Sequence, residues 1–264
     1  DMVPPAVARS FNGLIPIVIV IMIAAILNHL LSLVAPEGIN QIIYDTIQTP
    51  LRNIGVNIWS VTLLAIVQNL LWMVGIHGPN TLNALRSVIF TEADLSNQQF
   101  INNHGSIWDV PYPATWSNMN DTFANMGGSG MTLGLIIAIF WVSKRKDYRA
   151  VAKLAVVPGL FNINEPLMFG LPIVMNPILA VPFVLTPVIN IWVGYLVTNI
   201  LKWIPTPALG MTWTTPGPLM PFLGTGGNWL ALIIGFICLI ISVFTYMPFV
   251  MAANRVAEKE GQLD

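Results

Sequence analysis

Long stretches without a charged residue constrain this chain more than any other feature of its sequence. No Asp, Glu, Lys or Arg occurs in the segments 10–36, 53–85, 122–143, 166–201 and 203–254. Only 9% of the 264 residues are charged, whereas an average soluble domain carries roughly 25%. A soluble fold of this size cannot cover its surface with so few charges. Disorder is excluded more firmly still, because 55% of the residues are hydrophobic.

Several apolar runs within these stretches are long enough to cross a membrane, which takes about 20 apolar residues in a helix. The candidate spans are residues 14–34, 54–74, 126–143, 178–203 and 229–250. These runs are continuously apolar and do not alternate with a period of two, which favours helices over barrel strands. We therefore expect an all-α integral membrane protein with about five transmembrane helices, together with two re-entrant helical hairpins predicted as follows.

Helix breakers interrupt two of the apolar regions. Residues 154–177 contain four prolines, and an interior proline removes a backbone hydrogen bond. Broken backbone at membrane depth is tolerated only where protein or a water-filled cavity satisfies it, so this segment predicts a re-entrant hairpin. In the segment LLWMVGIHGPNTLNAL, an apolar helix meets a Gly-Pro break and continues as a short polar helix. This predicts another hairpin at about residues 54–90, with His77 near its tip.

The distribution of charges predicts a topology. The loop 144–153 holds the dense basic cluster Lys144, Arg145, Lys146, Arg149 and Lys153. The positive-inside rule assigns this loop to the cytoplasm. The polar segment 91–121 holds four acidic residues and no Lys or Arg, so we expect it to be extracytoplasmic. With 154–177 re-entrant, the C-terminus is cytoplasmic, although Lys202 then lies outside and weakens the charge argument.

Glu165 is the only acidic residue between Asp147 and Glu258. An ionisable side chain in a membrane segment is expensive, and its default interpretation is functional. The alternative is a structural carboxylate that caps backbone N–H groups at the hairpin tip. For His77 the same two interpretations, functional or structural, are open. The functional one has weaker support than for Glu165, because a neutral imidazole costs less free energy to bury. Glu165 could accept a hydrogen bond from a sugar hydroxyl, act as a general base or relay a proton.

Two tryptophans differ from those expected in an aromatic belt at the membrane interface. Trp72 lies five residues before His77, and Trp213 lies in the Pro/Gly-rich segment TWTTPGPLMPFLGTGG. Indole rings stack on sugar rings and can donate an N–H to a hydroxyl.

The single cysteine, Cys238, lies in an apolar run and is expected to have only a packing role. Three scattered histidines predict no metal site, and a net charge of −1 predicts no nucleic-acid partner.

Four longer motifs carry a resemblance to a known family. They are PGLFNINEPLMFGLPIVMNP at 158–177, VPPAVARSFNGLIP at 3–16, GIHGPN at 75–80 and WTTPGP at 213–218. Together they resemble the membrane (IIC) component of bacterial sugar phosphotransferase systems, within its lactose/cellobiose/chitobiose branch. The resemblance covers residues 1–264 as the C-terminal, substrate-binding part of a full permease. The first spans, which contribute much of the dimer contact in that family, are absent. The start DMVPPAVARSF, without an initiator Met or basic leader, agrees with a chain that begins inside a larger protein.

The resemblance implies a multi-pass protein of the bacterial plasma membrane, a homodimer at full length, that binds a β-linked disaccharide and needs no cofactor. A separate soluble IIB protein, charged through IIA, carries a phosphocysteine and phosphorylates the sugar's primary hydroxyl. By the same resemblance His77 and Glu165 hydrogen-bond that hydroxyl, with Glu165 as general base. Trp72 and Trp213 match positions expected to stack on the sugar. Asn80 and Asn164 are possible further polar contacts.

Two other classes of function remain open at this point. In an ion- or proton-coupled secondary transporter, Glu165 would be the coupling residue, and uptake would collapse with the ion gradient and persist without IIB. An intramembrane hydrolase with His77 as base would need a nucleophile nearby, and the sequence contains no recognisable motif for one.

Overall fold

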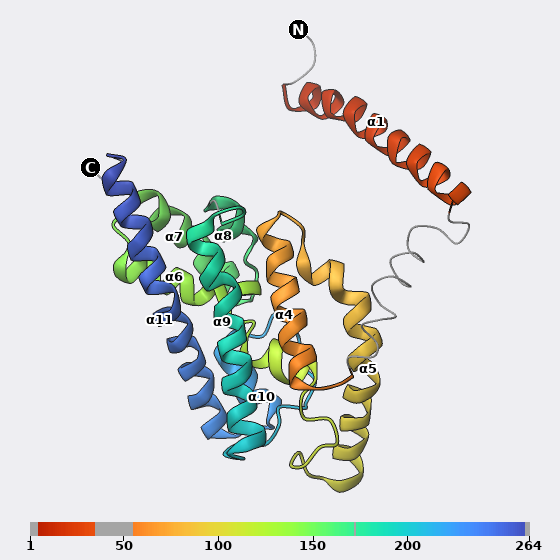
Figure 1. The fold of residues 1–264 in the computed structure, drawn as a ribbon, viewed down its shortest axis with the longest axis vertical. Helices are drawn as coiled ribbons and strands as arrows, with labels where there is room; N and C mark the ends of the chain where they lie inside the picture. Colours follow the sequence, from red (N-terminus) through yellow and green to blue (C-terminus); the bar gives the residue numbers. More distant parts are fainter. Residues whose placement is uncertain (1–4, 35–54, 172, 262–264) are drawn as a thin grey trace. The chain divides into compact units, whose positions relative to one another are not determined.

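A computed structural model describes residues 5–34, 55–171 and 173–261 of the chain (Figure 1). The chain divides into two compact units, residues 1–54 and 55–264. The described residues form helices and connecting loops, and they contain no β-strand. For these residues the predicted all-α fold is confirmed.

The first unit contributes one described element, the 30-residue helix α1 (Pro5–Val34). It contains the whole of the predicted span 14–34, and Pro16 lies inside it. The first residue of the predicted hairpin 54–90 lies outside the described residues.

Four helices form the body of the second unit: α4 (Ile58–Met73), α6 (Thr132–Val142), α9 (Pro177–Tyr195) and α11 (Trp229–Lys259). Helix α11 packs against α6 and α9, and α9 packs against α4 (Figure 1). Fully buried side chains such as Leu135, Phe183 and Tyr246 fill the space between them. The Tyr246 hydroxyl donates to the Gly130 carbonyl at 2.6 Å, which satisfies a polar group inside this apolar core.

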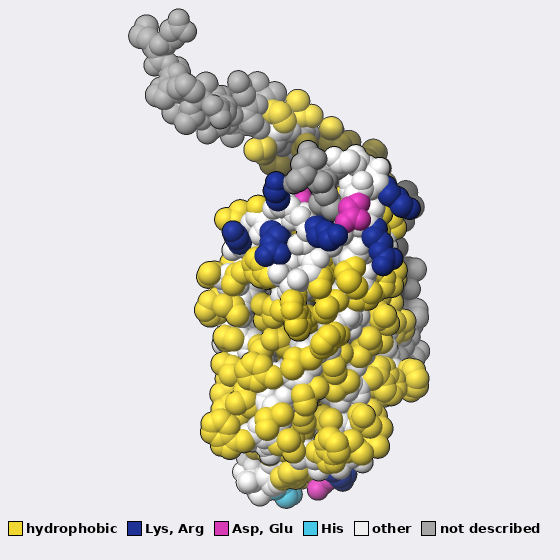
Figure 2. Space-filling model, turned by 90° about the vertical axis from the view of Figure 1, so that its left-hand side faces the viewer, with side chains coloured by type: hydrophobic (Ala, Val, Ile, Leu, Met, Phe, Trp, Pro, Cys, Tyr) yellow, Lys and Arg dark blue, Asp and Glu magenta, His cyan; other side chains and the backbone are white. Residues whose placement is uncertain are grey.

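Two described helices are long and apolar enough to cross a membrane: the continuous stretch Pro177–Ile200 and α11. Shorter apolar helices cover Pro16–Leu27, Ile58–Met73 and Ser129–Val142. Figure 2 shows a broad hydrophobic face on the second unit, with Lys and Arg side chains gathered at its upper end. Outward side chains of α11 such as Ile233, Ile240 and Phe244 are exposed, which suits contact with lipid. The number of crossings stays a prediction.

The first interrupted segment has the predicted break. Helix α4 ends at Met73, Gly75 adopts a φ of +81°, and α5 (Gly78–His104) begins directly after His77. The prediction of a short polar helix after the break is wrong, because α5 runs for 27 residues. No glycine or proline follows Pro79 until Gly105, whose φ of +63° ends the helix. The first half of the polar segment 91–121 is therefore helical.

The second interrupted segment comprises α7 (Lys146–Leu160) and the short helix α8 (Glu165–Gly170). Helix α7 begins within the basic cluster, and Pro158 lies in its last turn. Pro166 occupies the first turn of α8, where its missing N–H leaves no bond unmade. The Met175 N–H donates to the Met73 carbonyl at 2.9 Å, so the segment before α9 contacts the end of α4.

Short elements complete this unit: η2 (Ser117–Asp121), η3 (Ser129–Met131), η4 (Leu196–Ile200), η5 (Gly217–Leu219) and α10 (Met220–Gly224).

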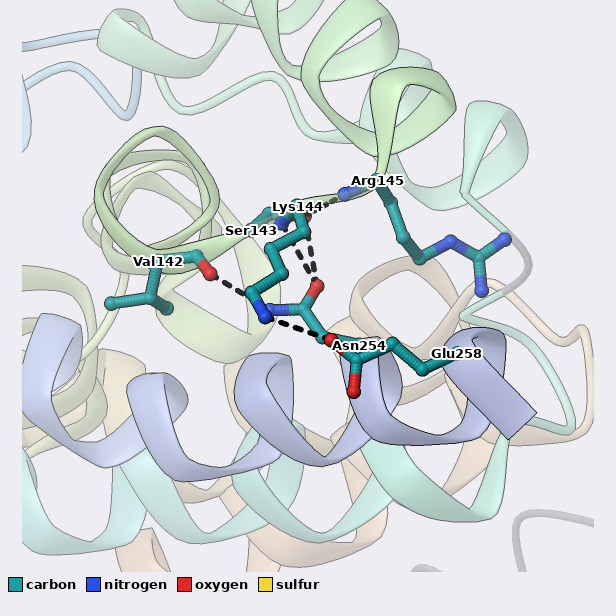
Figure 3. Close-up of polar contacts among 6 residues, drawn as sticks. All are labelled: Val142, Ser143, Lys144, Arg145, Asn254 and Glu258. Atoms are coloured by element: carbon teal, nitrogen blue, oxygen red, sulfur yellow. Dashed lines mark hydrogen bonds and ion pairs between the residues drawn. The ribbon is translucent and has the colours of Figure 1, made fainter. Parts of the chain in front are cut away.

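Polar contacts tie the basic loop to the C-terminal part of α11 (Figure 3). The Asn254 amide accepts from the Lys144 N–H at 3.0 Å and donates to the Val142 carbonyl at 2.8 Å. One turn later, Lys144 Nζ lies 2.8 Å from Glu258 Oε1. Lys202 follows η4, and its Nζ lies 3.0 Å from Asp109 Oδ1.

Candidate functional site

The two interrupted segments meet at a cavity of about 750 Å³. Its wall combines residues of α4, the start of α5, the loop before η3 and the tip between α7 and α8. All six residues predicted to contact substrate line this cavity: Trp72, His77, Asn80, Asn164, Glu165 and Trp213.

His77 and Glu165 approach each other in the wall of the cavity. His77 Nε2 lies 3.8 Å from Glu165 Oε1, and the two side chains are 39% and 43% exposed. Both groups are therefore open to a ligand. The separation is too long for a direct hydrogen bond, but one oxygen atom to the side of the line that joins them could lie at ordinary hydrogen-bond distance from both.

The local fold fixes the orientation of the His77 ring. His77 is the N-cap of α5, and its Nδ1 accepts the Asn80 N–H at 3.2 Å. A neutral imidazole that accepts at Nδ1 carries its proton on Nε2. The helix cap thus directs an N–H donor toward the Glu165 carboxylate.

Side-chain amides hold the tip that carries Glu165. Asn162, with a φ of +64°, accepts the Gly127 N–H at 2.8 Å. Its amide nitrogen donates to the Trp213 and Thr215 carbonyls, at 2.7 Å each. Asn162 therefore connects three segments that lie far apart in sequence.

Gly128 allows a close approach of the loop before η3 to the same tip. A Cβ at Gly128 would lie 2.8 Å from the Asn162 carbonyl oxygen, and its φ is +87°. Both facts favour glycine here. Next to this contact, the Asn164 amide donates to the Ser129 carbonyl at 3.0 Å, so its NH₂ group has a structural role.

The two cavity tryptophans differ in exposure. Trp213 is 60% exposed and offers an open ring. Trp72 is 2% exposed, and its ring lies 4.7 Å from the His77 ring and 6.5 Å from that of Phe169. The surroundings of Trp72 leave little ring face for a sugar to stack on.

Several polar lining residues were not predicted: Gln68, Asn83, Arg86, Asn120, Asp121, Asn125, Ser129 and Asn162. Gln68 had a usable signal, because it is polar in the middle of an apolar run. Arg86 and Asp121 only border charge-free stretches, and nothing in their spacing predicts that both reach one cavity. Arg86 donates to the Pro79 carbonyl at 2.8 Å and lies 4.7 Å from the centre of the Trp116 ring.

A smaller hollow of about 210 Å³ shares Asn83, Arg86 and Asp121 with the large cavity. The polar lining therefore extends along α5 beyond His77. Within the part of the chain that the structure describes, no three His, Cys, Asp or Glu side chains gather as metal ligands would.

Comparison with known proteins gives consistent matches. The family described as "Phosphotransferase system, EIIC" matches residues 1–187. The cellobiose-specific EIIC component of Lactococcus lactis is 34% identical, over 98% of this chain and 56% of that protein. The oligo-beta-mannoside-specific EIIC component of Bacillus subtilis is 32% identical, over 96% and 57%.

Among solved structures, the chain is similar to the crystal structure of the transporter ChbC, the IIC component of the N,N′-diacetylchitobiose-specific phosphotransferase system. The TM-score is 0.72 at 32% identity, over 99% of this chain and 60% of ChbC. This chain spans about half the length of the curated relatives it matches, 56% and 57% for these two.

Proposed function

Because this chain belongs to the EIIC family of the phosphotransferase system, we propose that it binds a β-linked disaccharide in the cavity between the two interrupted segments and presents a primary hydroxyl for phosphorylation. The disaccharide is of the cellobiose, lactose or diacetylchitobiose type. The observation that carries the proposal is the close approach of His77 Nε2 and Glu165 Oε1, 3.8 Å apart, in the wall of that cavity.

The geometry suits activation of a hydroxyl. With the sugar oxygen at hydrogen-bond distance from both groups, the Nε2–H of His77 donates to that oxygen and holds it in place. Glu165 accepts the hydroxyl proton as general base. The oxygen then forms a bond to the phosphorus of a phosphocysteine on IIB. The phosphorus–sulfur bond breaks, and the IIB thiolate leaves.

The rest of the lining suits an uncharged, hydroxyl-rich ligand. The exposed Trp213 ring can stack on a sugar face, and the Asn80 side chain offers a donor and an acceptor. Phosphorylation traps the product inside the cell, so no coupling ion is required.

For the topology, we propose that loop 144–153 and the C-terminus are cytoplasmic in a multi-pass protein of the bacterial plasma membrane. Support comes from the Asn254 and Glu258 contacts that hold these two regions together. Lys202, the residue at odds with this topology, forms an ion pair with Asp109 of the acidic segment.

The partners proposed are a soluble IIB protein and, through it, IIA, with a homodimer at full length. A relative from Staphylococcus aureus is named a lactose-specific EIICB component, and this chain is 33% identical to it over 45% of its length. That name supports an EIIC that acts together with a B component.

The test is cellobiose binding to the purified chain in lipid nanodiscs by isothermal titration calorimetry. Glu165→Gln replaces the charged acceptor of the reacting hydroxyl by a weaker, neutral one, and His77→Ala removes the Nε2–H donor. We expect affinity to fall about 10-fold in Glu165→Gln and about 10- to 100-fold in His77→Ala. His104→Ala and Glu258→Gln serve as matched controls, because they remove the same group types outside the cavity, and both should bind as wild type does. Unchanged affinity in both cavity variants would overturn the assignment.

Phosphoryl transfer separates this proposal from a secondary transporter that couples to ions through Glu165. With phosphorylated IIB, wild-type protein should yield sugar phosphate and Glu165→Gln should not. Uptake that needs an ion gradient and proceeds without IIB would instead identify the coupled transporter.

A further inference from the structure

Some buried polar atoms around the cavity have no hydrogen-bond partner. Burying such an atom without a partner costs free energy, so native structures satisfy nearly all of them. Among the described residues, three unpaired atoms belong to side chains that line the large cavity. They are Gln68 Oε1, Trp72 Nε1 and Arg86 Nε.

Two of these atoms come from the same face of one helix. Gln68 and Trp72 are four residues apart on α4, so their side chains are neighbours on its surface. Their exposed fractions are 3% and 2%. Water reaches neither side chain freely, and the protein supplies a partner to neither of the two atoms.

Both residues lie next to the reacting groups. The Trp72 ring lies 4.7 Å from the His77 ring. Gly78, the residue after His77, packs closely on the backbone of Gln68. A Cβ added at Gly78 would lie 2.1 Å from the backbone carbonyl oxygen of Gln68. Gln68 and Trp72 line the same cavity as His77 and Glu165, so a ligand held there can meet all four side chains.

The two unpaired atoms are complementary in chemistry. An indole N–H only donates, whereas the glutamine carboxamide oxygen accepts. Neither carries a charge. A donor and an acceptor one helical turn apart match an uncharged ligand with several hydroxyl groups, since each hydroxyl can both donate and accept.

We propose that Gln68 and Trp72 form a hydroxyl-recognition pair for the bound sugar, in which Gln68 Oε1 accepts from one hydroxyl and Trp72 Nε1 donates to another. This inference rests on the proposed function and adds to it a residue that determines which disaccharides bind. A sugar that lacks the hydroxyl facing Gln68 leaves a buried acceptor unpaired, and sites of this kind reject such analogues strongly.

The test compares Gln68→Leu with Asn69→Leu. Asn69, the next residue on α4, is also buried and also has an unpaired side-chain oxygen, but it does not line the cavity. Cellobiose affinity in nanodiscs should fall about 5- to 30-fold in Gln68→Leu and stay within about twofold in Asn69→Leu. Trp72→Phe, which keeps a ring and removes the N–H, should weaken binding about fivefold.

A panel of monodeoxy cellobioses distinguishes contact with sugar from a packing effect. Wild-type protein should bind one deoxy analogue markedly less well than cellobiose. Gln68→Leu should bind that analogue and cellobiose equally, because the contact is already lost. Should Gln68→Leu fold poorly, Gln68→Met is the variant for the same panel, since it keeps the length of the chain and lacks the amide.

Three results would overturn the inference. The first is wild-type affinity in Gln68→Leu, and the second is an equal loss in Asn69→Leu. The third concerns the deoxy analogues: each of them weakens binding to Gln68→Leu by the same factor as it weakens binding to wild-type protein. In each case wild-type protein still binds cellobiose, so the proposed function stands. Failure of wild-type protein to bind any β-linked disaccharide would overturn both.

Discussion

His77 has two roles that different atoms of one ring perform. Its Nδ1 caps the start of α5, and its Nε2 lies 3.8 Å from the Glu165 carboxylate in the cavity wall. Asparagine is also a favourable N-cap residue, but its shorter side chain cannot reach Glu165. The capping role and the proposed ligand role can therefore be separated by substitution.

We predict that His77→Asn keeps the thermal stability of wild-type protein while its cellobiose affinity falls about 10-fold or more. His77→Ala should lose the same affinity and, in addition, about 1 kcal/mol of stability, because the cap is lost. Thermal unfolding and calorimetric titration of both variants give the two quantities. Wild-type affinity in His77→Asn would mean that the ring serves only as a cap.

Alanine substitutions at Gly128 and Gly227 distinguish the conformational cost of a positive φ from the cost of a steric clash. Both have a strongly positive φ, +87° and +94°, but a Cβ at Gly227 would meet no atom closer than 3.7 Å. Gly227→Ala therefore pays only the conformational penalty, roughly 1 kcal/mol. Gly128→Ala should be more destabilising by a further 1–2 kcal/mol or so and should weaken cellobiose binding, because it displaces the tip that carries Glu165. Equal effects of the two substitutions on stability and binding would show that the close approach does not matter.

At the scale of the elements, side-chain amides position the interrupted segments. Asn162 fixes the tip between α7 and α8 through three hydrogen bonds. Asn254 makes a similar set of contacts at the basic loop, away from the cavity (Figure 3). The two residues form a matched pair for asking whether the tip must be held for sugar to bind.

Asn162→Leu and Asn254→Leu should each destabilise the protein by about 2–4 kcal/mol, because each leaves buried backbone groups unpaired. Only Asn162→Leu should also weaken cellobiose binding in the folded fraction, by about 10-fold. Calorimetric titration at a temperature well below both unfolding transitions measures this difference. An equal loss of affinity in Asn254→Leu would point to a general loosening of the bundle.

Local sequence signals predicted elements more reliably than contacts between them. The proline and glycine breaks predicted both interruptions, because these residues act on the backbone beside them. The length of α5 was missed, since a polar helix lacks the apolar run that marked the others. The bond from Asn162 to Trp213 joins residues 51 positions apart, and no periodicity connects them. Gln68 was not predicted as a lining residue, because the run 54–74 was interpreted as a uniformly apolar span and its polar residues were not considered separately.

At the scale of the whole molecule, the charge distribution predicts orientation. Lys146 lies in the basic cluster at one end of the second unit, and His104 ends α5 at the other (Figure 1). In intact cells, a membrane-impermeant maleimide should label His104→Cys, and Lys146→Cys only after permeabilisation. Cys238 is fully buried, so its background should be low. Labelling of Lys146→Cys in intact cells would reverse the topology.

A crystal structure of the chain with bound cellobiose is the decisive test of the proposed sugar site. We expect a sugar in the 750 Å³ cavity, with its primary hydroxyl oxygen about 3 Å from both His77 Nε2 and Glu165 Oε1. A sugar bound elsewhere, or one whose primary hydroxyl reaches neither group, would contradict it.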